Sequence, residues 1–465
     1  MGSKMANSRR LAMSVALALG VGACDSGPSE DGPQDAAVET AASSEISPLV
    51  IAPDRKSPEE SVAQSYVEQI DGLAEQDAVT AAMAQMEERR EEALELLIEL
   101  TEIPAPPFNE ERRGRRIAEL MRDIGYEDVA IDAVGNVIAR RAGNNGEKTV
   151  AIAAHMDTVF PPGTDVTVRR EGERLYAPGI GDNTRGVIAM LEIMRAIHEQ
   201  DIETEATLMF VANVGEEGLG DLEGVKHLFR EGGPRIDSFI AIDGGDQARI
   251  VQAAVGSHRY RVTFKGPGGH SWGAFGLANP HHALGRAIAI FDAEAPAVSA
   301  TEVKTSFNIG RIGGGTSVNS IPFESWMEVD MRSSRQHKID EMDAVFQSAV
   351  RRAVDAENAG RASGPELTVD IDMVGRRPAG ETDPRAPLVQ RAMAAVERYG
   401  FEPRLVTSST DSNIPMSLGI PAVTISRGGL GGNAHSPNEW WQDKNSHVGP
   451  QVALLVLLGS AGLAE

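Results

Sequence analysis

Residues 148–162 read KTVAIAAHMDTVFPP and begin with the pattern of a strand that an α/β core would accept. The first part of this stretch, 150–154, is an apolar run typical of a strand that is buried on both faces, as in parallel sheets covered by helices. The run ends at His155 and Asp157, which stand two residues apart. Because alternate residues of a strand point to the same side, we expect these two side chains to leave the sheet together at one edge.

Around this strand the sequence alternates between strand and helix patterns. The segment MAQMEERREEALELLIEL (83–100) has the apolar spacing of a helix. Further strands are expected at 206–211, 238–242 and 420–425, and further helices at 109–124, 186–198, 222–230, 387–399 and 448–463. Such alternation predicts an α/β fold with a largely parallel, helix-covered sheet.

A segment with a different residue pattern interrupts this alternation from about residue 249. Alternating patterns such as RYRVTFKG and FNIGRIGGG occur together with helices expected at 281–293 and 339–356. This combination indicates an inserted α+β domain. We therefore predict a main domain in two parts, 61–255 and 377–465, around an inserted domain at 256–376.

The N-terminal residues 1–24 resemble a bacterial lipoprotein signal. Arg9 and Arg10 precede an apolar run at 11–21, and the segment closes with VGAC, so that Cys24 would be the lipidated residue. An ordinary cleaved signal peptide is the alternative. Residues 25–60 are rich in Ser, Pro, Ala, Asp and Glu, which predicts a flexible tether. Together these segments predict an extracytoplasmic protein anchored to a bacterial membrane, on the periplasmic side or the cell surface.

The composition excludes several kinds of partner and site. A length of 465 residues favours two domains, and 41% hydrophobic with 24% charged residues is ordinary for a globular protein. The net charge of −24 argues against a nucleic-acid partner, because phosphate binding needs clustered Lys and Arg. The single cysteine excludes an internal disulfide and a cysteine-rich zinc site.

Acidic residues and histidines gather where the strands are expected to end, which is where α/β proteins place their sites. They are His155, Asp157, Asp182 in APGIGDNTRG, Glu216 and Glu217 in GEEG, Asp243 after SFIAID, and His435 in RGGLGGNAHSPNEW. So many carboxylates need positive charge to share one cleft, and the strand ends supply little beyond Arg185. Divalent metal ions would provide it: the ligand types suit zinc, with cobalt or manganese as alternatives. The number of ligands favours two metals that share a carboxylate.

Each of these features has an ordinary structural alternative when taken alone. A His-x-Asp pair is common in cores and on surfaces, a Glu-Glu pair is usually a solvated turn, and a histidine in a glycine-rich loop usually has no special role. The placement of all of them after strands is what favours a metal site. The remaining histidines are interpreted as structural: His198, His227, His258, His281, His282, His337 and His447.

The motifs HMDTVFP, GIGDNTRG, GEEGLG, AIDGG and AHSPNEW together resemble those of the two-zinc peptidase and deacylase family, in the family's order. Its members include peptidase T, carboxypeptidase G, acetylornithine deacetylase and succinyl-diaminopimelate desuccinylase. The resemblance covers about residues 86–464 and implies a zinc-exopeptidase-like catalytic domain with a ferredoxin-like lid. It also implies that His155 and Asp243 hold one zinc, that Glu217 and His435 hold the other, and that Asp182 bridges the two.

The resemblance assigns further roles. Asp157 would accept the second ring N–H of His155, and Glu216 would act as general base. In the lid segment GPGGHSWGAFG, His270 would donate to the oxyanion of the transition state, and in relatives this histidine often reaches the neighbouring subunit's site. The lid is therefore a candidate dimerisation domain. Asn319 and Arg332 are candidates for binding a substrate carboxylate, with a surface salt bridge as the alternative for Arg332.

One motif departs from the family pattern. Asn183, Thr184 and Arg185 follow Asp182, where the family commonly has a small or acidic residue and then lysine, which blurs the subfamily. With the lipoprotein-like N-terminus, the residues predict a zinc-dependent exopeptidase that hydrolyses short peptides, like a dipeptidase or tripeptidase. An N-acyl-amino-acid deacylase or a carboxypeptidase of the same family is the alternative. The presence of Glu216 argues against a non-catalytic binding protein on this fold.

Overall fold

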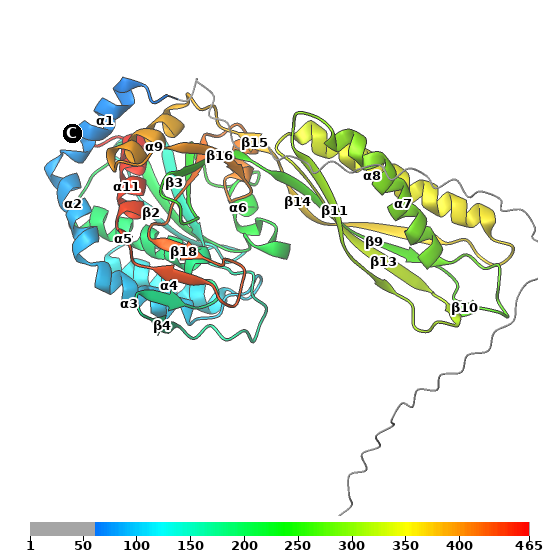
Figure 1. The fold of residues 1–465 in the computed structure, drawn as a ribbon. Coiled ribbons are helices and arrows are strands. Elements are labelled where there is room, and N and C mark those ends of the chain that lie inside the picture. The colour runs from blue at the N-terminus through cyan, green and yellow to red at the C-terminus, as the bar shows by residue number, and fades with distance from the viewer. Residues whose placement is uncertain (1–60, 465) are drawn as a thin grey trace, which may run out of the picture. The chain divides into compact units, whose positions relative to one another are not determined.

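The computed structural model describes residues 61–464. The predicted signal segment with Cys24 and the predicted tether lie outside these residues. The described elements form two groups, each with its own hydrophobic core (Figure 1). Within the described part of the chain, no helix combines the length and the apolar character needed to cross a membrane.

The larger group is built on a mixed sheet that has nine strands in the described chain, in the order β1-β2-β6-β3-β7-β17-β8-β15, with β16 paired to β8. Its centre is parallel, since β3 pairs in parallel with β6 and β7, and β7 with β17. The outer pairs β1–β2, β2–β6 and β8–β15 are antiparallel. The bounds are β1 Asp128–Ile131, β2 Val137–Arg141, β3 Thr149–His155, β6 Thr207–Asn213, β7 Ser238–Ile242, β8 Arg249–Ala254, β15 Gly380–Glu381, β16 Arg404–Ser408 and β17 Ala422–Ile425. The predicted α/β class is confirmed.

Strand β3 is buried on both faces, as its apolar run predicts. Val150 and Ile152 belong to the core on one face of the sheet, whereas Ala151 and Ala153 belong to the core on the other. A strand that is covered on both sides needs apolar residues at every position, and only its end can carry polar side chains. His155 is the last residue of this strand.

Helices cover the sheet of the larger group. Those of the larger group are α1 Gln64–Ala74, α2 Asp77–Glu88, α3 Arg90–Thr101, α4 Glu111–Ile124, α5 Gly186–Glu199, α6 Glu223–Leu228, α9 Pro387–Arg398, α10 Asn413–Ser417 and α11 Val448–Ala461. The segment 83–100, expected to be one helix, is divided between α2 and α3. Arg89 has φ −94° and ψ 19° at the junction, which breaks the helix although the apolar spacing continues. Helix α11 is buried along almost its whole length, which explains its continuous apolar sequence.

The second group is a four-stranded antiparallel sheet in the order β11-β13-β9-β14, packed against α7 and α8. In chain order the elements read β9-α7-β11-β13-α8-β14, which is the ferredoxin-like arrangement that the resemblance implied. Phe291 of α7 and Phe346 of α8 pack edge to face in its core, with ring centroids 5.2 Å apart. The bounds are β9 Gly256–Lys265, α7 Pro280–Ser299, β11 Thr305–Gly314, β13 Glu324–Ser333, α8 Gln336–Gly360 and β14 Thr368–Arg377. We call this group the lid and the larger group the main domain.

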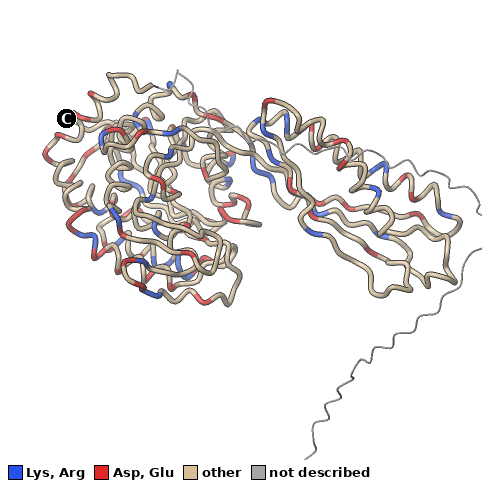
Figure 2. Tube along the Cα trace, viewed as in Figure 1, with Lys and Arg blue, Asp and Glu red and all other residues tan. Residues whose placement is uncertain are grey.

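Two smaller elements were not expected from the sequence. A sheet in the order β18-β19-β5-β4 joins segments more than 250 residues apart, and a short ribbon pairs β10 with β12 in the lid. Their bounds are β4 Arg169–Glu171, β5 Arg174–Tyr176, β10 Gly269–His270, β12 Ser320–Ile321, β18 Leu430–Gly432 and β19 Trp440–Gln442. Acidic and basic residues are interspersed along both groups (Figure 2).

Candidate metal and catalytic site

The parallel strands bring the predicted site residues to one edge of the main sheet. His155 ends β3, Glu216 and Glu217 follow β6, and Asp243 follows β7. The Asp243 N–H donates to the carbonyl of Ile425 at the end of β17, 2.8 Å away, which extends the parallel pairing up to the site. Parallel strands have their carboxyl ends at the same edge, and this is why residues nearly 90 positions apart converge.

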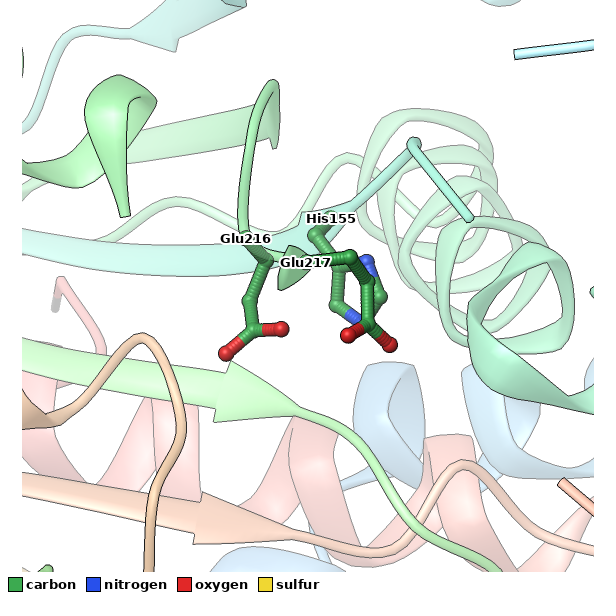
Figure 3. Close-up of side chains that lie close together, drawn as sticks. All are labelled: His155, Glu216 and Glu217. Atoms are coloured by element: carbon green, nitrogen blue, oxygen red, sulfur yellow. The ribbon is translucent and has the colours of Figure 1, made fainter. Parts of the chain in front are cut away.

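Three groups of side chains in the described chain could each hold a metal ion, with ligand atoms within 4.8 Å of one another. They are His155/Asp182/Asp243, Asp182/Glu217/His435 and His155/Glu216/Glu217. The first two groups share Asp182 and contain the two ligand sets that the resemblance implied. Figure 3 shows the third group, in which the His155 ring and both carboxylates extend to the same side of the loop. Glu216 is therefore an alternative ligand on distance alone.

Asp182 lies between the two histidines. Its Oδ1 is 3.4 Å from Nε2 of His155, and its Oδ2 is 3.2 Å from Nε2 of His435. His435 Nε2 is also 2.9 Å from Oε1 of Glu217. His435 has φ +64°, a left-handed conformation that is uncommon outside glycine and asparagine and that aims its ring at the carboxylates.

The ionisable side chains of the site shift one another's pKa values. Burial opposes a charged His155 ring, but hydrogen bonds with Asp157 and Asp182 raise its pKa well above the usual value. Hydrogen bonds with Asp182 and Glu217 raise the pKa of His435 to about 10. Burial raises the pKa of Asp243, and the nearby Asp182 adds to this effect. The protein alone thus holds protons where the donor atoms converge, and a metal ion would replace those protons.

Asp157 supports the site in more ways than the sequence indicated. Its Oδ1 lies 3.4 Å from Nδ1 of His155, so the ring faces it as expected. In addition, the backbone N–H of Glu216 donates to Oδ1 at 3.0 Å, and that of Glu217 donates to Oδ2 at 2.8 Å. The Asp157 side chain is fully buried. One carboxylate therefore positions the end of β3 and the Glu216-Glu217 loop together.

A second buried carboxylate, Glu439, holds the loop that carries Asp182. Its Oε1 accepts hydrogen bonds from the N–H groups of Gly181 at 2.8 Å and Asp182 at 2.7 Å, and its Oε2 accepts one from Gly179 at 2.8 Å. Burial raises its pKa to about 7. At the other end of this loop, a Cβ on Gly186 would lie 2.7 Å from the carbonyl oxygen of Ile242, so the approach of α5 to β7 requires glycine.

Glu216 has an ion-pair partner that the sequence analysis missed. Nη1 of Arg377 donates to Oε1 of Glu216 at 2.9 Å and to Oγ of Ser409 at 3.0 Å, and its Nη2 donates to the carbonyl oxygen of Glu216. Both side chains are buried. Burial raises the pKa of Glu216 well above its usual range, whereas Arg377 acts in the opposite direction. Arg377 ends β14, the last strand of the lid.

Two further buried carboxyl groups surround the site. Asp411 accepts a hydrogen bond from Nδ2 of Asn213 at 2.9 Å, and burial raises its pKa to about 7. Glu110 accepts a hydrogen bond from the N–H of Gly215 at 3.2 Å, and burial also raises its pKa to about 7. The only sequence signal for Asp411 is the polar run STDSN after β16, and Glu110 follows the proline-rich break before α4.

The site opens into a cleft of about 990 Å³ that includes three arginines from the lid strands, Arg259, Arg332 and Arg377. Arg332 lines this cleft, and it also forms the salt bridge that was its alternative interpretation, since its Nε donates to Oδ2 of Asp330 at 2.6 Å. The residues Asp182, Glu216, Glu217, Asp243 and His435 also line the cleft. The structure thus places one of the predicted carboxylate-binding residues at the metal-ligand candidates.

His270 and Asn319 do not line this cleft. They lie together at the β10–β12 ribbon, where the Ser271 N–H donates to the Asn319 carbonyl at 2.9 Å. The ribbon follows the end of β9 at Lys265, whereas Arg332 pairs with Ser257 near the start of that strand. Eight residues of strand separate these two ends of the lid, or about 26 Å. Within one chain, His270 and Asn319 thus belong to the opposite end of the lid sheet from Arg332.

The residues fit a pair of divalent cations. The donor set is imidazole and carboxylate, which suits zinc, cobalt and manganese, and Asp182 offers one oxygen to each group. Asp157 provides the carboxylate behind a histidine ligand that such sites usually have.

Comparison with known proteins agrees with this chemistry. Residues 151–458 match the model of "Peptidase family M20/M25/M40". An uncharacterised protein, YqjE of Bacillus subtilis (strain 168), is 26% identical over 352 residues, which cover 72% of this chain and 90% of that protein. Carboxypeptidase G2 of Pseudomonas sp. (strain RS-16) is 25% identical over 280 residues, covering 57% of this chain and 62% of that protein.

The fold has solved counterparts. The crystal structure of aminopeptidase PepT from Bacillus cereus ATCC 10987 superposes with a TM-score of 0.64 at 23% identity, covering 80% of this chain and 99% of that chain. The family model spans well over half of the sequence and includes every metal-ligand candidate named above. The chain therefore belongs to peptidase family M20/M25/M40 and is a metal-dependent hydrolase of amide bonds.

Proposed function

We propose that this protein is a two-metal exopeptidase that hydrolyses short peptides, with zinc as the native metal. The observation that carries the proposal is the position of Asp182, whose two oxygens face His155 and His435 in two ligand groups that share this one carboxylate. Two zinc ions held there would polarise the scissile carbonyl and lower the pKa of the attacking water.

Glu216 is the proposed general base. Its carboxylate lies beside the metal-ligand candidates but is bonded to Arg377, so it does not depend on a metal for its position. In this role it takes a proton from the attacking water and delivers it to the leaving amine. Burial raises the pKa of Glu216, as a carboxylate that must accept a proton near neutral pH requires, and the positive charge of Arg377 limits this rise. Arg377 is thus a positioning residue for the base.

The lid is proposed to complete the site from a second subunit. His270 and Asn319 lie at the end of the lid sheet away from Arg332, which fits contacts with a neighbouring chain better than contacts with their own cleft. In this arrangement His270 donates a hydrogen bond to the oxyanion, and Asn319 helps to orient the substrate. Arg332 lies at its own cleft, and although its Nε is paired with Asp330, its terminal N–H groups would bind a substrate carboxylate.

The choice of short peptides rests on the cleft and on the named relatives. The cleft of about 990 Å³ fits a few residues and contains the cationic side chains that a free terminal carboxylate requires. Two of the similar proteins are named as an aminopeptidase and a carboxypeptidase, which are both activities at chain ends. An N-acyl-amino-acid deacylase or a carboxypeptidase is the second candidate, because a carboxylate-binding Arg332 serves those substrates equally well.

The cellular setting is also a proposal. The lipoprotein-like segment ending at Cys24 supports a lipid anchor and peptide hydrolysis outside the cytoplasm. Metabolic labelling with a fatty-acid probe, with and without Cys24→Ala, would test this point independently of the chemistry.

The function is tested by a release assay on zinc-loaded protein. The panel contains dipeptides, tripeptides, longer peptides blocked at one terminus or at both, and N-acyl amino acids, and free amine is measured. We expect turnover of unblocked dipeptides and tripeptides that stops on chelation and returns with zinc. Hydrolysis confined to N-acyl amino acids would favour the deacylase, and hydrolysis of the interior bonds of doubly blocked peptides would contradict an exopeptidase.

A further inference from the structure

A buried arginine in the wall of the cleft has no role in the chemistry described so far. Arg427 follows β17 in the sequence ISRGG, and only 6% of its surface is exposed. Its backbone N–H donates to the carbonyl of Gly244 at 2.9 Å, which fixes it beside the loop that follows Asp243. Arg427 lines the same cleft as Asp182 and Glu217.

The glycines around Arg427 leave room for its guanidinium but offer it no side-chain partner. Glycines stand on three sides: a Cβ at Gly181, Gly245 or Gly431 would lie 2.7, 3.5 or 2.9 Å from Nη2 of Arg427. The Nε atom is buried without a hydrogen-bond partner, and within residues 61–464 no carboxylate forms an ion pair with this guanidinium. A buried charge that lacks a direct partner is costly, so a bound anion would relieve that cost.

The carboxylates near Arg427 do not supply this partner. Arg427 lowers the pKa of Asp182, Asp243 and Glu439 through space, yet no hydrogen bond or ion pair joins it to any of the three. Cations held by Asp182 and Asp243 would neutralise those two carboxylates, and the oxygens of Glu439 already accept three backbone N–H groups, so the Arg427 guanidinium has no directly bonded anion. A second arginine, Arg249, is partly buried at the start of β8, where this loop ends, and a Cβ on Gly244 would lie 3.1 Å from its Nη1.

We propose that Arg427 and Arg249 form an anion-binding subsite on the main domain that selects substrates carrying a carboxylate in addition to the one proposed for Arg332. Both guanidinium groups lie against the Gly244-Gly245 segment, and both line the cleft. A guanidinium binds a carboxylate through two parallel N–H donors, which gives selectivity over the neutral amide of the same shape. The substrate class is therefore a short acidic peptide with a Glu or Asp side chain. This inference rests on the proposed peptide hydrolysis.

The test compares substrates that differ only in one charge. Kinetics of the zinc-loaded enzyme are measured on the pairs Ala-Glu/Ala-Gln, Glu-Ala/Gln-Ala and Ala-Asp/Ala-Asn. In at least one pair we expect kcat/KM for the acidic member to exceed that for the amide by about 10- to 100-fold, the usual range for one charged hydrogen-bonded contact. Arg427→Gln should remove this preference by slowing only the acidic member, and Arg427→Lys should restore part of it.

Two controls separate binding from folding. Arg170→Gln makes the same change in net charge at an exposed position outside the cleft and should leave the preference intact. Arg249→Gln should reduce the preference in the same direction as Arg427→Gln, and because Arg249 is less buried it remains informative if Arg427→Gln does not fold. Equal rates within every pair for the wild-type enzyme would overturn the subsite. An equal loss on acidic and neutral peptides in Arg427→Gln, or a loss of metal, would also overturn it by making Arg427 structural.

A binding measurement covers the case in which no peptide is hydrolysed. That result would refute the proposed function but not the subsite. Calorimetric titration of the metal-loaded protein with L-glutamate and L-glutamine then decides, because the two differ only at the side-chain carboxylate. Tighter binding of glutamate that Arg427→Gln abolishes supports the subsite, and equal affinities contradict it.

Discussion

Asp157→Asn changes one atom of the carboxylate that joins β3 to the Glu216-Glu217 loop. In the wild type, two oxygens accept two backbone N–H groups, at 3.0 and 2.8 Å. Asparagine has one oxygen, so its amide NH₂ must face either the N–H of Glu216 or that of Glu217. One of these buried donors loses its partner, and the other keeps a neutral acceptor in place of a charged one.

The expected cost can be worked out from these two bonds. A buried N–H left without a partner costs about 1–3 kcal/mol, and the change from a charged to a neutral acceptor costs about 1 kcal/mol more. The sum is about 2–4 kcal/mol in the free energy of unfolding of the metal-free protein. Because Asp157 also faces the ring of His155, metal affinity should fall by about 10- to 100-fold, as is typical when the residue behind a ligand is changed.

The assay is urea unfolding of the metal-free protein followed by circular dichroism, together with competition for zinc against a chelator. Asp355→Asn on the exposed side of α8 is the matched control, and it should change stability by no more than about 0.5 kcal/mol. A value for Asp157→Asn within the range of this control, with unchanged metal affinity, would refute the idea that Asp157 organises the site.

Three further predictions follow from the same geometry. Glu216→Gln should keep the metal content while kcat falls by roughly 10²- to 10⁴-fold, the usual contribution of acid–base catalysis; metal loss would instead make Glu216 a ligand, as the third ligand group allows. His270→Ala should lower kcat by about 10²- to 10³-fold without loss of metal, and mixing it with Glu216→Gln protein should restore part of the activity if the histidine acts across subunits; no recovery on mixing would place His270 in its own chain. The metal-free protein should lose stability as the pH rises from 5 to 8, because burial raises the pKa values of Glu110, Asp411 and Glu439 to about 7. These groups favour folding below their unfolded pKa values near 4, and the stability is lost as they ionise through pH 7. Urea midpoints that rise with pH over this range would show that these carboxyl groups are not buried as described.

The metal-ligand candidates could be predicted because they follow directly from strand ends. His155, Glu217 and Asp243 come after apolar runs that can only be buried strands, and parallel strands bring their carboxyl ends together. The lid could be predicted from its change of pattern at about residue 249. The break at Arg89 could not, because the apolar spacing continues through it and the structure alone shows the turn.

Sequence patterns did not indicate Arg377 and Glu439, which hold the site residues in place, and the reason is physical. Arg377 bonds to Glu216 across 161 residues, and Glu439 bonds to Asp182 across 257 residues. Nothing local distinguishes these side chains from surface charges, since their burial depends on how distant segments pack. Arg427 is another buried charged residue that its local sequence does not distinguish from a surface residue. Sequence patterns thus indicate which residues stand at the ends of strands, whereas tertiary packing decides which charged residues hold them in place.

Two metal ions that share Asp182 are the basis of the proposed chemistry, and the metal content per chain measures them directly. Elemental analysis of the purified, zinc-loaded protein should give about two metals per chain, as a bridged pair requires. His435→Ala should retain about one, and Asp182→Ala should lose most of both. A wild-type protein with a single metal, or a His435→Ala variant that still holds two, would rule out a metal pair bridged by Asp182.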